Sequence, residues 1–247
     1  MAKRRESEGA ARPVAVRARG EPAFVLSTHP WRETSLIAEL LTRNYGRVTV
    51  VVRGAKRVSS RFRGLVNPFV PLLVSFSGPG DIKNLTDARW LGGLAPIEPE
   101  SLVSAFYVNE LVLRLTARAD ACPELFEAYV GILADLALKR GRELSAALRR
   151  FEIKLIASQG WSQAGKSEEI KAGGMWTVCG GELVRAREQT EAHMCVSAAS
   201  ALAVASGKIP RSADLREVRD VLRLIIGYYV GERGLKTRKT VESWTQF

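Results

Sequence analysis

Apolar residues alternate with polar ones, or form short runs, from residue 21 to about residue 94, and this pattern predicts five β-strands. Turn signals such as Asn44-Tyr45-Gly46 separate them. Pro68 and Pro71 interrupt the fourth segment, which is therefore expected at a sheet edge. Five short strands with tight turns are typical of a small barrel or sandwich. The predicted strands are Ala23–Ser27, Arg32–Leu41, Val48–Arg53, Leu65–Phe76 and Ile82–Arg89.

After Pro96 and Pro99 the apolar residues recur every three or four positions, as in amphipathic helices. The pattern predicts helices over Ser101–Arg118, from near Pro123, and over Glu143–Ser158, Ser197–Ser206 and Ser212–Val230. Residues 159–196, with two Gly-Gly pairs, indicate a loop-rich insert. We therefore expect an α+β multidomain protein. Its parts are an arm (1–20), a β-domain (21–96), an α-helical domain containing the insert (97–240) and a C-terminal tail (241–247).

The chain has 37 Lys and Arg residues against 26 Asp and Glu residues, a formal net charge of +11. This balance favours nucleic acid or an anionic membrane surface as a partner over a neutral small molecule. Residues 1–20 carry six basic residues, two acidic ones and few apolar ones, so a disordered basic arm is expected there. Loose phosphate contacts and a solubilising role both remain open for this arm.

Nothing in residues 1–20 resembles a secretory signal, and no stretch reaches the roughly 18 uncharged apolar residues of a membrane helix. The three cysteines are widely spaced and odd in number, unlike a secreted disulfide framework. We expect a soluble cytoplasmic protein, associated with the nucleoid if it binds DNA.

A dense group of cations falls within the β-domain, and no acidic residue lies among them. Turn residues surround them, which indicates basic loops between strands. Such a surface attracts a polyanion because each neutralised phosphate releases condensed counterions. A solvated loop with incidental charge is the alternative. The cations are Arg43, Arg47, Arg53, Lys56, Arg57, Arg61 and Arg63.

Exposed aromatic rings would add base stacking to such a surface. Tyr45 lies in a predicted turn, and Phe62 lies between Arg61 and Arg63. These two rings are therefore expected to face a bound nucleic-acid strand. A hydrophobic cover over the β-domain is the alternative for Tyr45.

Motifs for catalysis are absent from the sequence. It has no G-x-x-x-x-G-K-[ST] phosphate loop, no H-E-x-x-H and no G-x-S-x-G, and we expect no enzyme. Cys179, His193 and Cys195 fall within the insert, but neither cysteine belongs to the C-x-x-C pair that organises a structural zinc site. We predict no zinc and no other cofactor.

Several motifs, in order along the chain, resemble the bacterial RecO family of DNA repair and recombination mediators. In the β-domain they are Phe24-Val-Leu, Pro30-Trp-Arg-Glu-Thr-Ser35, Thr42-x-x-x-Gly46-Arg-Val, Arg53-Gly-Ala-Lys-Arg57 and Pro68-Phe-x-Pro-Leu72. Further on they are Tyr107-x-Asn109-Glu-Leu111, Pro123-Glu-Leu-Phe126, Leu148-Arg-Arg-Phe-Glu152 and Gly234-Leu-Lys-Thr-Arg238. Each motif is modest, but the ordered set covers nearly the whole chain after residue 20.

The resemblance implies an N-terminal OB-fold and an α-helical domain, often with a zinc-binding insert whose cysteine pairs this chain lacks. It also implies binding of single- and double-stranded DNA, annealing of complementary strands without nucleotide hydrolysis, and recombinase loading onto DNA coated by single-stranded DNA-binding protein. The implied partners are RecR and the acidic, hydrophobic C-terminal tail of the coating protein.

Carried onto this chain, the resemblance assigns the segment from Arg53 through Arg63 to DNA and Leu148–Glu152 to the tail-binding helix. Arg149 or Arg150 would pair with carboxylates of the tail, and Phe151 or Ile153 would supply an apolar wall. Core packing of Phe151 with both arginines solvated is the alternative. An RNA-binding OB-fold protein and a protein–protein adaptor remain open as functions.

Overall fold

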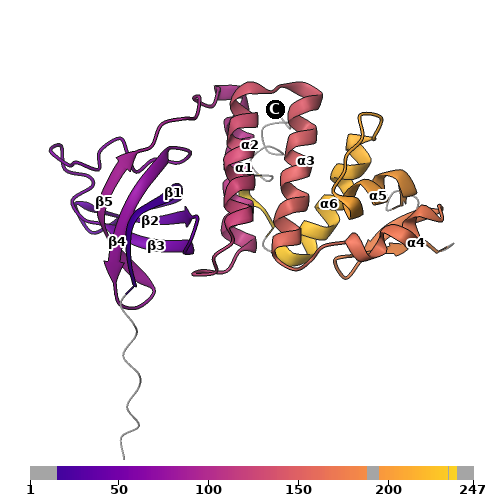
Figure 1. Cartoon of the computed structure of the whole chain (residues 1–247), viewed down its shortest axis with the longest axis horizontal. Coiled ribbons are helices and arrows are strands. Elements are labelled where there is room, and N and C mark those ends of the chain that lie inside the picture. The colour runs from indigo at the N-terminus through magenta and orange to yellow at the C-terminus, as the bar shows by residue number, and fades with distance from the viewer. Residues whose placement is uncertain (1–15, 188–194, 233, 238–247) are drawn as a thin grey trace, which may run out of the picture.

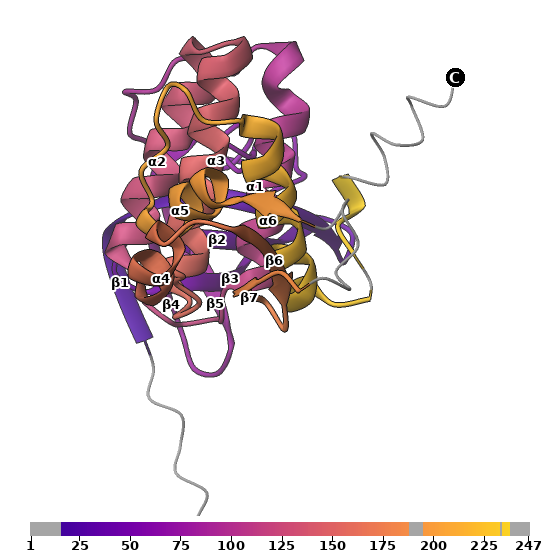
Figure 2. The same cartoon turned by 90° about the vertical axis from the view of Figure 1, so that its right-hand side faces the viewer.

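The computed structural model describes residues 16–187, 195–232 and 234–237, and it has three layers in a row. Figure 1 shows a β-barrel at one end, a group of long helices in the middle, and a smaller part that contains α4 and α5 at the other end. Seen from that smaller end in Figure 2, the barrel strands lie behind the helices. The α+β, multidomain architecture expected from the sequence is confirmed.

Five of the described strands close into a barrel with the order β1-β2-β3-β5-β4. All neighbouring strands are antiparallel except β3 and β5, which pair in parallel. This closed five-strand order is that of an OB-fold. The strands are β1 (Val16–Trp31), β2 (Ser35–Thr42), β3 (Gly46–Val52), β4 (Pro71–Gly78) and β5 (Ile82–Trp90).

Two expectations about the barrel were wrong. The first strand begins at Val16, because Ala18 points into the barrel core while Arg17 and Arg19 point outward. The predicted basic arm therefore loses residues 16–20, and the rest of it lies outside the described residues. The fourth strand is not an edge strand: β4 begins at Pro71 and pairs with both β1 and β5. A proline at the first position of a strand is compatible with a central place.

The helical domain follows the predicted order. Prolines stand at the first helical positions of α1 and α2, where the missing N–H costs no hydrogen bond. The long helices are α1 (Pro99–Leu115), α2 (Pro123–Leu138), α3 (Gly141–Ser158) and α6 (Leu215–Val230), and a shorter one is α5 (Ala198–Ser206). Asp214 caps α6 by accepting a hydrogen bond from the backbone N–H of Arg216 at 2.8 Å.

The insert is more ordered than a loop-rich segment. It contains a 3₁₀ turn (Ala164–Lys166), α4 (Ser167–Lys171) and a three-stranded sheet in the order β7-β6-β8. The strands are β6 (Met175–Cys179), β7 (Glu182–Arg185) and β8 (Val196–Ser197). Gly180 and Gly181, both with positive φ, form the two-residue turn between β6 and β7. Fully buried Trp176 and Leu183 join this sheet to the helical core.

The middle of β1 lies between two hydrophobic cores, one inside the barrel and one among the helices. Ala23 and Val25 point into the barrel, whereas Phe24 and Leu26 belong to the helical core. The Phe24 ring lies against Tyr129 of α2, with centroids 5.2 Å apart. A continuous apolar run, rather than alternation, is the sequence sign of a strand buried on both sides.

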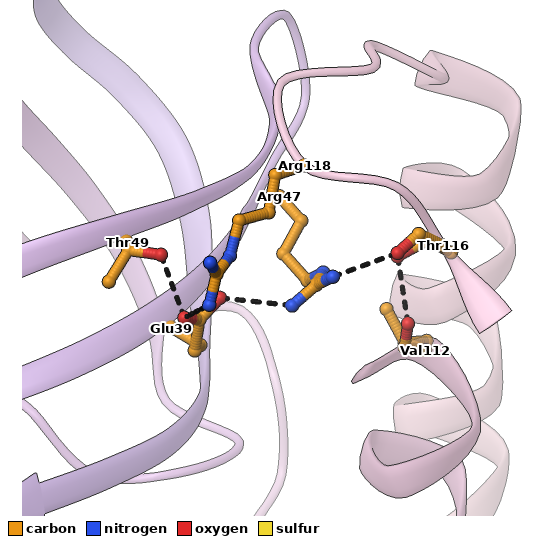
Figure 3. Close-up of polar contacts among 6 residues, drawn as sticks. All are labelled: Glu39, Arg47, Thr49, Val112, Thr116 and Arg118. Carbon is orange, nitrogen blue, oxygen red and sulfur yellow. Dashed lines mark hydrogen bonds and ion pairs between the residues drawn. The ribbon is translucent and has the colours of Figure 1, made fainter. Parts of the chain in front are cut away.

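A charged cluster at the same junction holds the segment after α1 against the barrel (Figure 3). Glu39 of β2 is paired with Arg47 of β3 at 3.1 Å and with Arg118 at 2.7 Å. Arg47 also donates a hydrogen bond to the carbonyl of Thr116 at 2.9 Å. These contacts draw the chain away from the helix axis, which explains why α1 ends at Leu115 and not at Arg118 as predicted.

Candidate nucleic-acid interface

Residues 53–64, the first part of the segment between β3 and β4, are here called the basic loop. Successive turns shape it, and its backbone N–H at Lys56 donates to the carbonyl of Thr34 at 2.9 Å. The side chains of Ala55 and Phe62 are buried in the barrel core. The burial of these two side chains turns the cations of the loop outward, where they remain exposed. The exposed cations are Arg53, Lys56, Arg57, Arg61 and Arg63.

The other two cations of the predicted group lie at the opposite end of β3. Seven residues of strand span roughly 20 Å. Arg43 pairs with Glu127 of α2 at 3.2 Å, and Arg47 is held by Glu39 with its side chain 13% exposed. Arg47 thus serves the contact between the domains, and neither Arg43 nor Arg47 lies on the basic loop. The seven cations are close in sequence, but the length of β3 separates Arg43 and Arg47 from the five cations of the basic loop.

The two aromatic rings that were expected to face a nucleic-acid strand both pack against the barrel. Phe62 is 7% exposed within the barrel core, so its expected contact with a base is wrong. The Arg61 guanidinium lies over this ring, 4.9 Å from its centroid. Tyr45 is partly buried and packs edge-on against Phe76 at 5.5 Å, as the hydrophobic-cover alternative requires. Tyr45 is therefore also left out of the proposed interface.

Beside the basic loop lies a hollow of about 750 Å³, here called the barrel hollow. The β1–β2 turn forms one wall, with Trp31, Arg32 and Glu33, and the start of the basic loop forms another, with Arg53 and Arg57. Asn84 of β5 also lines it. Reasoning from the sequence gave Trp31 and Arg32 no role. The signal was a tryptophan at a strand end, directly followed by an arginine.

In the helical domain, two adjoining hollows of about 400 and 490 Å³ share Arg142 and Leu215. Together they form a groove between α3 and α6, here called the helical groove. Arg142 shapes it by donating hydrogen bonds to the carbonyls of Arg211 and Ala213. Its apolar patches come from Leu148, Leu215 and Ile209. Its cations are Lys139, Arg142, Arg149, Arg150, Arg211, Arg216 and Arg219, against Glu143 and Asp214.

The predicted tail-binding residues fall into two groups. Phe151 and Ile153 are 2% and 8% exposed in the helical core, so the expectation that they form the apolar wall is wrong. Arg149 is paired at 2.8 Å with Glu152, a carboxylate that is fully buried and also accepts from the Tyr107 hydroxyl. Arg150 is partly exposed and lines the helical groove. Leu148 and Leu215 supply the apolar surface in place of the two buried residues.

The insert brings its two cysteines to different places: Cys179 ends β6 at the hairpin turn, and Cys195 precedes β8. Across the described ranges, no three His, Cys, Asp or Glu side chains gather closely enough to hold a metal ion. His193 lies outside the described residues, so the expected absence of zinc stays a prediction. In the same ranges no helix is long and apolar enough to cross a membrane.

Comparison with known proteins finds the same family over both domains. Residues 19–94 match the family described as "Recombination protein O N terminal", and residues 98–239 match "Recombination protein O C terminal". The boundary between the two matches falls in the segment that joins β5 to α1.

Individual relatives carry the name "DNA repair protein RecO". The protein of Aromatoleum aromaticum is 38% identical over 229 residues, which cover 90% of this chain and 94% of the relative. That of Thiobacillus denitrificans is 36% identical over 243 residues, covering 93% and 94%. That of Laribacter hongkongensis is 38% identical over 229 residues, covering 89% and 92%.

Proposed function

The chain belongs to the RecO family of DNA repair proteins, and from that membership we propose that it binds single- and double-stranded DNA through the basic loop. One observation carries the proposal: five exposed cations stand on a single loop of an OB-fold barrel, with a hollow beside them. OB-folds bind oligonucleotides on the face of strands 2 and 3 and on the loop between strands 1 and 2. The barrel hollow adjoins that loop.

The proposed activity is annealing and recombinase loading without nucleotide hydrolysis. Two complementary strands repel each other through their phosphates, and a cationic surface that holds both backbones lowers this repulsion while the bases remain accessible. No bond has to be made or broken by the protein in such a step. RecR is the expected partner of the loading step.

The helical groove supports a second element of the proposal, the binding of the acidic, hydrophobic C-terminal tail of single-stranded DNA-binding protein. Of the seven groove cations, Lys139, Arg149 and Arg219 are paired with carboxylates of this chain and Arg142 holds backbone carbonyls. Arg150, Arg211 and Arg216 lie beside Leu148 and Leu215, so carboxylates and an apolar end residue would both find complementary groups there. Docking on this tail would bring the basic loop to strands that the coating protein occupies.

The test is DNA binding by a variant with Arg53, Lys56 and Arg57 replaced by alanine, measured over a range of salt concentrations. Each phosphate contact contributes about 0.7 to 0.9 to the slope of log affinity against log salt. We expect weaker binding of both single strands and duplexes, and a slope smaller by about 2 to 3.

The matched control replaces Arg89, Lys154 and Lys171, which are exposed cations outside the basic loop. It also removes three positive charges. Its salt slope should differ from that of the unchanged protein by no more than the contribution of about one phosphate contact. Equal slopes for the two triple variants would contradict a DNA contact at the basic loop.

A further inference from the structure

Trp31 is an exposed tryptophan at the end of barrel strand β1. Its backbone is the strand partner of Ser35 at the β1–β2 turn, and the residue is 43% exposed. The ring lines the barrel hollow. The volume of this hollow, about 750 Å³, is far larger than the roughly 30 Å³ that one water molecule occupies. The other aromatic rings that the sequence placed near the basic loop are packed into the barrel, so Trp31 is the ring that this hollow offers to a ligand.

The hollow is held in shape by contacts between its two walls. The Lys56 backbone N–H bonds the carbonyl of Thr34 at 2.9 Å, and its ammonium lies 3.4 Å from the carbonyl of Arg32. Arg32 adopts a positive φ of 52°, which is uncommon outside glycine and costs about 1 kcal/mol or more. Arg53 and Arg57 line the same hollow as the Trp31 indole before any ligand arrives.

We propose that Trp31 stacks on one unpaired base and thereby makes the barrel hollow selective for single strands over duplexes. This inference rests on the proposed DNA binding of the basic loop. A base in a duplex has both faces covered by its neighbours, so an indole can stack only on a base that is unpaired or extruded. Trp31 is thus a residue that determines specificity for strandedness.

The charges around the hollow set the orientation of the strand. Arg53 and Arg57 attract the sugar-phosphate backbone to the basic loop, whereas on the turn Glu33 offsets the charge of Arg32. The Arg32 guanidinium lies 6.0 Å from the Trp31 ring centroid. The backbone therefore follows the basic loop, and the base points toward Trp31. The amide of Asn84 offers both a donor and an acceptor to the edge of that base. Duplexes bind through the exposed cations alone.

The test compares the binding of an oligothymidylate and of a blunt duplex of equal length by the full-length protein and its variants. W31A is expected to bind the single strand roughly 5- to 150-fold more weakly, the range that corresponds to loss of one stacked base. Its duplex affinity should stay within about twofold. W31F keeps a ring and should recover most of the single-strand affinity. W90A removes a tryptophan that is 67% exposed on β5 and should change neither affinity.

Tryptophan fluorescence gives a second readout. Stacking on a base quenches an indole, so W31F should bind the oligothymidylate yet lose part of the quench seen with the unchanged protein. If W31A proves too unstable to measure, W31F and its fluorescence carry the test. An unaltered quench in W31F, or equal losses of single-strand and duplex affinity in W31A, would overturn the proposal.

Failure of this inference and failure of the proposed function are separate results. If W31A binds both DNA forms as the unchanged protein does, while the Arg53, Lys56 and Arg57 triple variant binds neither, stacking is rejected and the basic loop is retained. If the triple variant keeps both affinities and W31A alone loses the single strand, the basic loop is rejected and stacking is retained.

Discussion

Asn109 of α1 donates a hydrogen bond from Nδ2 to the backbone carbonyl of Leu26 in β1, at 2.8 Å. Its Oδ1 accepts a hydrogen bond from the Tyr129 hydroxyl of α2. Burial raises the pKa of Tyr129, which keeps this hydroxyl protonated as a donor. One buried amide therefore joins the barrel strand β1 to two helices where β1 packs against the helical core.

Asn109→Ala should lower the free energy of unfolding by about 2–4 kcal/mol, because it leaves a buried carbonyl and a buried hydroxyl without partners. Urea unfolding measures this change. Tyr129→Phe removes the hydroxyl and should cost less, since the bond to Leu26 survives. If Asn109→Ala proved no more destabilising than Tyr129→Phe, the bond to the barrel would have little weight.

Glu39→Gln should destabilise the protein by about 2–3 kcal/mol, because it removes the carboxylate that neutralises partly buried Arg47. Asp87→Asn is the control, since its pair with Arg89 is exposed and should be worth less than about 1 kcal/mol. The comparison is between the two urea midpoints. Similar midpoints would mean that the Glu39 cluster contributes no more than a surface pair.

Gly46→Ala should be among the more damaging single changes in the barrel. Gly46 has a φ of +65°, and a Cβ at this position would overlap the backbone of Asp120, which follows α1. Gly64→Ala is the matched control, because Gly64 has a φ of +78° but open space around it. We expect about 1 kcal/mol for Gly64→Ala from the backbone alone, and about 3 kcal/mol or more for Gly46→Ala from the added overlap. Thermal unfolding of both variants decides whether the close approach of the two domains requires a glycine.

The attachment of residues 236–237 to α1 should weaken in acid. Burial raises the pKa of Glu110, but the backbone N–H groups of Thr237 and Lys236, the Thr237 hydroxyl and the charge of Arg114 together lower that pKa below its usual value. A carboxyl whose folded pKa is lowered stabilises the fold above its unfolded pKa, about 4.3. That contribution is lost as the pH falls through the folded value.

Amide hydrogen exchange at Lys236 and Thr237 measures this attachment. Protection factors should hold from neutral pH down to about pH 5 and then fall. Glu110→Gln should show reduced protection across that whole range, whereas Glu100→Gln, at an exposed position of the same helix, should match the unchanged protein. Protection that is independent of both pH and Glu110 would contradict the assignment.

Binding of an acidic peptide with an apolar C-terminal residue should depend on the helical groove. Arg150→Ala combined with Arg216→Ala removes two groove cations, and each charge-assisted contact is worth about 1.5–3 kcal/mol. We expect a loss of affinity of at least tenfold by calorimetry. The double control Lys171→Ala and Arg185→Ala removes the same charge from exposed positions of the insert, and an equal loss there would place the peptide outside the groove.

The barrel was largely predictable because its signals are local. Turn residues and β-branched runs such as Val48–Val52 marked the strands, and the change to helical spacing marked the second domain. Pro71 misled the prediction because its sequence neighbours do not reveal that the barrel closes around β4. The insert misled it because Trp176 and Leu183 become core residues only when the helices are present to cover them.

The candidate interface was predictable in part. The cations of the basic loop stay exposed because short-range turns and the burial of Ala55 and Phe62 fix their direction. Arg47 and Phe151 changed roles because their surroundings come from distant segments, a carboxylate on β2 in one case and the helical core in the other.

By itself, the sequence determined the order of strands and helices, the two-domain division and the basic character of the loop before β4, since each depends on neighbours along the chain. The tertiary structure decided which cations remain available, where the apolar surface of the helical groove lies, and that Trp31 faces a hollow. Those properties arise where Glu39 meets Arg47, where α3 meets α6, and where the basic loop meets the β1–β2 turn. Each joins segments whose proximity is created only by folding.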